Sequence, residues 1–105
     1  MSLPPPLSDE RRRAALAKAA EARRQRAELK ERLKSGETSL KELLQHTDDE
    51  TVSKMKVSTV LESMPGVGKV RTRRLMERLN ISESRRIRGL GIKQRESLLK
   101  EFEER

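Results

Sequence analysis

The chain of 105 residues contains no cysteine. This absence excludes disulfide bonds, a thiolate metal site and a cysteine nucleophile. His46 is the single histidine, so the sequence offers no cluster of the usual nitrogen and sulfur ligands. We therefore expect no metal site, no cofactor and no catalytic residue.

Aromatic residues are almost absent as well, with no Trp, no Tyr and one Phe, Phe102. Proteins that bind single-stranded nucleic acid usually stack the bases on aromatic side chains. This chain cannot provide such a platform. Phe102 lies on the apolar face of the last predicted helix and is expected to belong to the core.

Long hydrophobic runs are missing from the sequence. The start, MSLPPPLSDERRR, lacks the apolar stretch of about 7 to 15 residues that a signal peptide carries. No later segment approaches the roughly 20 apolar residues of a membrane span. We therefore expect a cytoplasmic protein without membrane association.

Hydrophobic residues make up only 32% of the chain, so the core is expected to be too small to enclose a large active site.

Charge is what the sequence has in excess. Charged residues make up 40% of the chain, and the formal net charge is +8. Residues 1–36 have a net charge of +5, residues 37–64 of −3 and residues 65–100 of +8. The excess indicates a polyanionic partner. An acidic segment around Asp48, Asp49 and Glu50 separates the two basic regions. It is interpreted as a solvated face, a surface that keeps the polyanion to one side, or a contact for a protein partner.

The spacing of the apolar residues predicts an all-α protein with about five or six helices and no strand. We expect a flexible arm over residues 1–7, a long basic helix over residues 8–36 and a compact bundle of short helices over residues 37–105. Ser8, Ser39 and Ser58 are predicted helix caps, and Gly36 and Asn80 are predicted helix ends. Ser82 is expected to open a further short helix.

The long helix has no internal glycine or proline between Asp9 and Lys34, and would form a rod about 39 Å long. Its basic side chains are either a solvated surface or a second phosphate-binding surface. Its predicted apolar stripe is thin and consists of Ala15, Ala19, Ala22, Leu29 and Leu33. In a later helix, over residues 69–79, the predicted apolar positions are Val70, Leu75, Met76 and Leu79.

The stretch LESMPGVGKV, residues 61–70, resembles a phosphate-binding loop. A Walker A loop is excluded, because Ser63 and Val70 occupy positions that require Gly and Ser or Thr. Gly66 and Gly68 instead suit a hairpin between two helices, where backbone N–H groups face outward. Together with the N-terminus of the following helix and the charges of Lys69 and Arg71, they predict a site for a backbone phosphate.

A second basic motif, RRIRGLG, begins at Arg85. Ile87 and Leu90 are its predicted apolar anchors, and the arginines Arg85, Arg86 and Arg88 are expected to contact two phosphates or a narrow minor groove. The alternative is that Arg85 or Arg86 pairs with Glu77 or Glu83.

The stretch VSTVLESMPGVGKVRTRRLMERLNIS resembles the helix-two-turns-helix module of formamidopyrimidine-DNA glycosylases and of a ribosomal protein. With ALAKAAEARRQRAELKERLKSG before it and SESRRIRGLG after it, the chain resembles the actinobacterial (mycobacterial-type) integration host factor family over almost its whole length. Thr72 departs from helix-hairpin-helix modules, which often have Ala there. The DNA contacts expected from the motifs and the resemblance are Gly66, Val67, Gly68, Lys69, Arg71, Arg74, Arg85, Arg86 and Arg88.

The resemblance implies a nucleoid-associated, monomeric protein that binds double-stranded DNA with little sequence preference, through the phosphate backbone and the minor groove. It also implies a role in site-specific recombination and a phage integrase as a partner. DNA bending or compaction is expected from the charge distribution, because two basic regions on opposite sides of an acidic segment are hard to satisfy on one straight duplex. Residue chemistry alone leaves a structured, ribosome-associated RNA as the alternative ligand. Glycosylase activity is not expected, because the chain has no zinc finger and no domain left over to form a base pocket.

Overall fold

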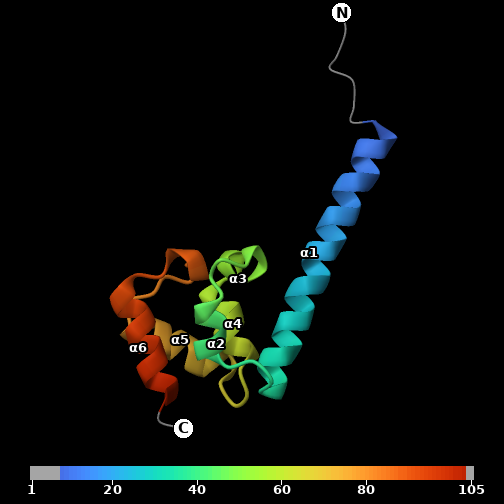
Figure 1. Ribbon diagram of the computed structural model, residues 1–105. Coiled ribbons are helices and arrows are strands. Elements are labelled where there is room, and N and C mark those ends of the chain that lie inside the picture. Colours follow the sequence, from blue (N-terminus) through green and yellow to red (C-terminus); the bar gives the residue numbers. More distant parts are fainter. Residues whose placement is uncertain (1–7, 104–105) are drawn as a thin grey trace, which may run out of the picture.

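The computed structural model describes residues 8–103, and within this range every regular element is helical (Figure 1). The predicted all-α class is confirmed, whereas the expected arm over residues 1–7 lies outside the described residues. The elements are α1 (Asp9–Ser35), α2 (Leu40–Gln45), α3 (Glu50–Lys54), α4 (Val57–Ser63), α5 (Gly68–Arg78), the 3-10 helix η1 (Ile87–Gly89) and α6 (Ile92–Glu103). None of these helices is long and apolar enough to cross a membrane.

Helix α1 begins and ends as its sequence predicts. The Ser8 hydroxyl accepts a hydrogen bond from the Arg11 N–H at 3.2 Å, which satisfies one of the free amides of the first turn. Gly36 ends the helix in the left-handed region, at φ 81°. The turn at Gly36 lets the chain reverse and places α2 beside the bundle (Figure 1).

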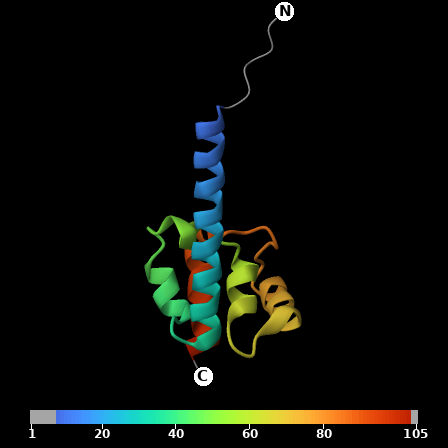
Figure 2. The same ribbon diagram turned by 90° about the vertical axis from the view of Figure 1, so that its right-hand side faces the viewer.

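Only the C-terminal half of α1 packs against the rest of the protein. Leu29 and Leu33 are buried, but every residue from Asp9 to Glu21 is exposed, so Ala15 and Ala19 of the predicted apolar stripe do not pack into the core. Figures 1 and 2 show this half of α1 projecting beyond the bundle. Its helicity rests on alanine propensity and the Ser8 cap. Nearer the bundle, ion pairs of Arg24 with Glu21 and Glu28 stabilise α1 further.

The core lies between α1 and α6, which stand on opposite sides of the bundle (Figures 1 and 2). Helix α4 is its centre, since Val57, Val60 and Leu61 are at most 1% exposed. Helices α1 and α5 both contact α4, and α2 contacts α6. Phe102 is half-buried and packs against the core, as predicted. This arrangement exposes the turn between α4 and α5 at one end of the bundle.

Two predicted elements are wrong, and one backbone pairing explains both. The chain segments at Lys56 and Arg86 form an antiparallel bridge, in which the Val57 N–H donates to the Arg85 carbonyl and the Ile87 N–H to the Met55 carbonyl, each at 2.9 Å. Helix α4 therefore begins at Val57 after Lys56, without the predicted Ser58 cap. The predicted helix from Ser82 is replaced by turns and η1, because its backbone groups bond to the distant segment.

Helix α5 departs from its predicted apolar face at Val70, whereas Leu75 and Met76 are buried as predicted. Val70 is 66% exposed, although it was predicted to face the core, and Thr72 is only 2% exposed. The Thr72 hydroxyl donates a hydrogen bond to the Gly68 carbonyl at 2.7 Å. The departure at Thr72 therefore does not prevent close packing, because its polar atom is satisfied within the helix. The helix is followed by Asn80 in the left-handed region, at φ 57°, which confirms that prediction.

Candidate nucleic-acid interface

The α4–α5 hairpin has the backbone that its glycines predict. Gly66 and Gly68 have φ angles of 74° and 67°, in the left-handed region. A Cβ built on either residue meets no atom within 4 Å, so the glycines are required by the backbone angle and not by crowding. Val67 between them is buried and anchors the turn. The outer side of the hairpin is therefore open to a ligand.

The N-terminus of α5 opens onto this hairpin. The N-cap residue is Val67, and no side chain caps the helix. The first amides of a helix have no partner within the helix, and the aligned peptide dipoles favour negative charge there. An anion at the hairpin would accept hydrogen bonds from these N–H groups, and the exposed Lys69 stands in the same turn.

Helix α1 supplies lysines to the hairpin that the sequence did not predict as part of this site. A hollow of about 630 Å³ lies between the last turns of α1 and the hairpin, and Lys30 and Lys34 line it together with Gly66 and Gly68. Glu31 and Glu62 also line it. The sequence signal was the i, i+4 spacing of the two lysines, which places them on one face of α1. Only the packing of α1 on α4 turns that face toward the hairpin.

Arg71 differs from the other expected contacts on α5. It is half-buried, and its guanidinium carbon lies 5.7 Å from the centre of the Phe102 ring, a cation–π contact with α6. Its Nη2 atom is buried and has no hydrogen-bond partner among residues 8–103. Arg74 is exposed, like Lys69. The geometry therefore places Arg71 against α6 and leaves Lys69 and Arg74 facing solvent.

The arginine motif is attached to the bundle through Ile87, which is 1% exposed. Arg85 donates from Nη1 to the Gly89 carbonyl at 2.6 Å, and Arg86 donates from Nη1 to the Lys54 carbonyl. No ion pair joins either arginine to Glu77 or Glu83 within the described part of the chain, so the alternative interpretation of these residues is wrong. Arg88 is exposed on η1.

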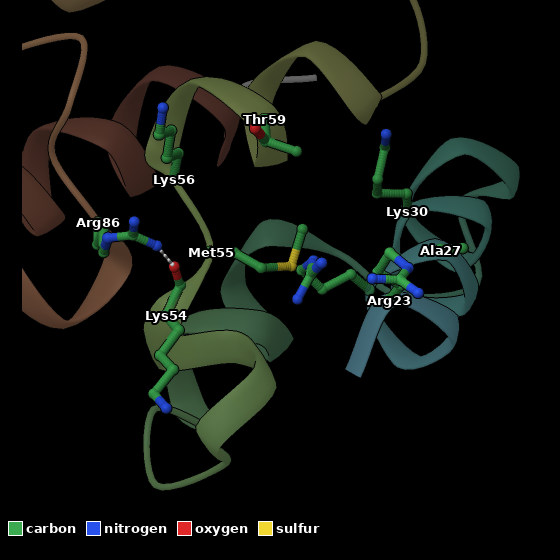
Figure 3. A pocket seen from close by; sticks show the side chains of 9 residues that line it. Arg23, Ala27, Lys30, Lys54, Met55, Lys56, Thr59 and Arg86 are labelled. Carbon is green, nitrogen blue, oxygen red and sulfur yellow. Dashed lines mark hydrogen bonds between the residues drawn. The ribbon is translucent and has the colours of Figure 1, made fainter. Parts of the chain in front are cut away.

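A cationic basin lies between the middle of α1 and the segment that holds Arg86 (Figure 3). The basin has a volume of about 730 Å³. Arg23, Arg26 and Lys30 come from one face of α1, and Lys56 and Arg86 come from the opposite wall. We define the basin by its lining residues, which are Arg23, Arg26, Ala27, Lys30, Lys54, Met55, Lys56, Thr59 and Arg86.

Lys54 contributes less to the basin than its position suggests. Its amine forms an ion pair with Glu50 in the same helix, and Figure 3 shows the side chain pointing away from the other labelled cations. The hydrogen bond and the positive charge of Lys54 lower the pKa of the Glu50 carboxyl. The acidic segment is thus partly neutralised locally: Glu50 pairs with Lys54, and Asp49 caps α3 by accepting from the Thr51 N–H at 2.8 Å.

The hairpin, with two left-handed glycines before an uncapped helix, defines a helix-two-turns-helix protein. The sequence model of the S13-like H2TH domain family matches residues 33–102 of this chain. Among curated proteins, the chain is 60% identical to the integration host factor of Streptomyces coelicolor, with 93% of this chain and 92% of that protein covered. It is 54% identical to that of Mycobacterium tuberculosis, over 93% and 94% of the two chains.

The chain therefore belongs to the integration host factor family of these actinobacteria, as the sequence resemblance predicted. A solved structure gives an independent comparison. The structure of sIHF bound to an 8-base-pair palindromic DNA is similar with a TM-score of 0.79 and 57% sequence identity, and the match covers 82% of this chain and 98% of that one.

Proposed function

We propose that this protein is a nucleoid-associated architectural protein that binds the phosphate backbone of double-stranded DNA with little dependence on sequence, and bends or compacts it. One observation carries the proposal: the left-handed Gly66 and Gly68 leave the N-terminus of α5 open beside Lys69, with Lys30 and Lys34 facing the same hollow. Such a terminus is suited to a phosphate. The relationship to sIHF, which was solved with DNA, supports DNA as the polyanion.

The proposed interface has two parts. The hairpin, comprising Gly66, Val67, Gly68 and Lys69 and extended by Arg74, binds one stretch of backbone. The motif of Arg85, Arg86 and Arg88 binds a second stretch or enters the minor groove, where arginine is favoured when the groove is narrow. Arg71 is proposed to act through the position of α5, because its guanidinium lies over Phe102. Lys30 and Lys34 are added from the fold.

The proposal includes no catalytic role, and the protein is proposed to act as a monomer in the cytoplasm, on the nucleoid. Assistance to site-specific recombination, with a phage integrase as partner, is proposed from membership of a family whose relatives carry the name integration host factor. A bent duplex would bring distant recombination sites together, which is how an architectural protein assists without chemistry of its own.

A comparison of duplexes tests the ligand class. We expect a DNA duplex to bind at least about tenfold more tightly than an RNA duplex of the same sequence and length, because the A-form minor groove is wide and shallow and no longer suits arginine insertion. Fluorescence anisotropy at one salt concentration measures both affinities. Equal or tighter binding of the RNA would contradict the proposal and favour the structured-RNA alternative.

Single-molecule imaging tests the architectural role. Intact protein is expected to bend duplex DNA, provided that its contacts offset a bending cost on the order of 1 to 6 kcal/mol. Arg88→Gln should reduce the bend angle, since Arg88 is exposed on η1. Substituting Arg11, Arg12 and Arg13 together by Gln should leave the bend and abolish bridging between two duplexes, because these residues lie on the projecting half of α1.

The two variants serve as controls for each other, since both remove exposed charge without touching the core. Deleting the whole of α1 would not serve, because Leu29 and Leu33 are buried. Straight, uncompacted DNA at saturating intact protein would contradict the architectural role. The protein would then cover DNA without changing its shape. Circular dichroism of each variant checks that the helical fold is retained.

A further inference from the structure

The cationic basin is not explained by the hairpin. Its positive side chains approach from two walls, α1 on one side and the segment of Lys56 and Arg86 on the other (Figure 3). No carboxylate lines the basin, in contrast to the hollow at the hairpin, which contains Glu31 and Glu62. Like charges held together without a counter-charge raise the local potential and attract anions.

Most of the positive side chains that line the basin form no ion pair with a carboxylate in the part of the chain that the structure describes. Across residues 8–103, none of the ion pairs involves Arg23, Arg26, Lys30, Lys56 or Arg86. The guanidinium of Arg86 is oriented by its hydrogen bond to the Lys54 carbonyl, which uses Nη1. An arginine offers five N–H donors, so Arg86 keeps donors for a ligand while its direction is fixed by the protein.

The shape and the chemistry of the lining select a class of ligand. A volume of about 730 Å³ falls in the range of roughly 300 to 1,000 Å³ that small-molecule sites occupy. The uncharged lining residues are Ala27, Met55 and Thr59, with no aromatic side chain to stack on a base. A rigid duplex presents its phosphates on a convex surface, whereas a flexible phosphate chain can contact both walls of a hollow.

We infer that the cationic basin binds a short linear chain of three or more phosphates, such as inorganic triphosphate or longer polyphosphate. Recognition is by charge and hydrogen bonding to the phosphate oxygens, without selectivity for a base. Guanidinium groups bind such oxygens in bidentate fashion, and the lysines neutralise the remaining charge.

Occupation of the basin has a consequence for the hairpin. Lys30 lines both the basin and the hollow beside Gly66 and Gly68. A phosphate chain in the basin would draw its amine away from the hairpin, and would also occupy Arg86. A bound phosphate chain would thereby weaken DNA binding, so the affinity for DNA would depend on the concentration of phosphate chains. This coupling rests on the proposed DNA-binding function, but occupancy of the basin itself does not.

The test is a calorimetric titration of full-length protein with inorganic triphosphate, without DNA and at fixed ionic strength. We expect saturable binding of one triphosphate per chain, tighter than that of sulfate. The double variant Arg26→Gln with Lys56→Gln should weaken binding by at least about tenfold, since two charge-assisted contacts are lost. A matched control, Arg73→Gln with Lys93→Gln, removes the same charge at exposed positions outside the basin and should change the affinity by less than about twofold.

Three results would overturn the inference: triphosphate binding no tighter than sulfate binding, equal losses in the two double variants, or loss confined to the control. If the basin instead holds a second duplex, Arg26→Gln with Lys56→Gln will remove a second equivalent of bound DNA while triphosphate behaves like sulfate. That outcome also overturns the inference. Because the titration contains no DNA, absence of triphosphate binding would not contradict the proposed DNA-binding function. Absence of DNA binding would likewise not change the conclusion drawn from the triphosphate titration.

Discussion

The affinity of this protein for duplex DNA is expected to fall by about 10³-fold between about 50 and 200 mM salt, with log K decreasing against log salt at a slope of about −5. Each phosphate that a lysine or arginine neutralises releases condensed counterions and contributes about −0.9 to the slope. The side chains expected to make these contacts are exposed, namely Lys30, Lys34, Lys69, Arg74, Arg86 and Arg88. About six contacts are therefore expected.

Two substitutions on α5 show whether the slope comes from the proposed interface. Lys69→Gln should make the slope shallower by about 1, because one phosphate contact is lost. Arg71→Gln should leave it unchanged, since the Arg71 guanidinium lies over the Phe102 ring. The measurement is a series of anisotropy titrations across the salt range. A slope near zero for the intact protein would exclude the backbone-binding mechanism, and a change at Arg71 would return that residue to the interface.

Replacing Gly68 by Val is expected to weaken DNA binding by about 1.5 to 3 kcal/mol, the worth of a charge-assisted hydrogen bond, or roughly 10- to 150-fold in the dissociation constant. Gly68 has a φ of 67°, and a β-branched residue rarely adopts this angle. Relaxation of the backbone would turn the first N–H groups of α5 away from the phosphate. Steric crowding is not the cause, because a Cβ at Gly68 has no neighbour within 4 Å.

Gly68→Asn is the matched control for Gly68→Val. Asn also adds a side chain but tolerates the left-handed region, so it should retain most of the affinity. If both variants lose affinity equally, the added side chain blocks the approach of DNA and the backbone angle is not decisive. Unchanged affinity in a folded Gly68→Val protein would mean that the hairpin is only structural. Far-ultraviolet circular dichroism and a thermal melt establish that the variants are folded.

Features that depend on neighbouring residues were predictable from the sequence. The Ser8 and Ser39 caps, the end of α1 at Gly36 and the left-handed Asn80 all appear in the structure. Each depends on hydrogen bonds or backbone angles within a few residues. The hairpin belongs to this group, since two glycines next to a helix start define its backbone locally. The family resemblance, which rests on the same motifs, is confirmed by the comparisons.

The environments of Ser82, Val70 and Arg71 were not predictable from local pattern. The segment after Ser82 has the composition of a short helix, but the Lys56–Arg86 bridge takes its backbone groups. Helix α5 has few apolar residues, so several rotations satisfy its pattern. In the folded bundle, where α5 contacts α4, Thr72 is buried and Val70 is exposed, and Arg71 lies over Phe102 of α6. Each outcome depends on a partner that is distant in sequence.

By itself, the sequence determined the helical class, the excess of positive charge and the position of the glycine hairpin that we propose binds phosphate, because composition and short-range spacing specify these. Only the tertiary structure decided which charges act together. Lys30 and Lys34 join the hairpin, and Arg23 and Arg26 face Lys56 and Arg86 across the basin, because Leu29 and Leu33 pack into the core and set the rotation of α1. Burial of apolar side chains fixes how a helix is turned, and the charged faces follow from that rotation.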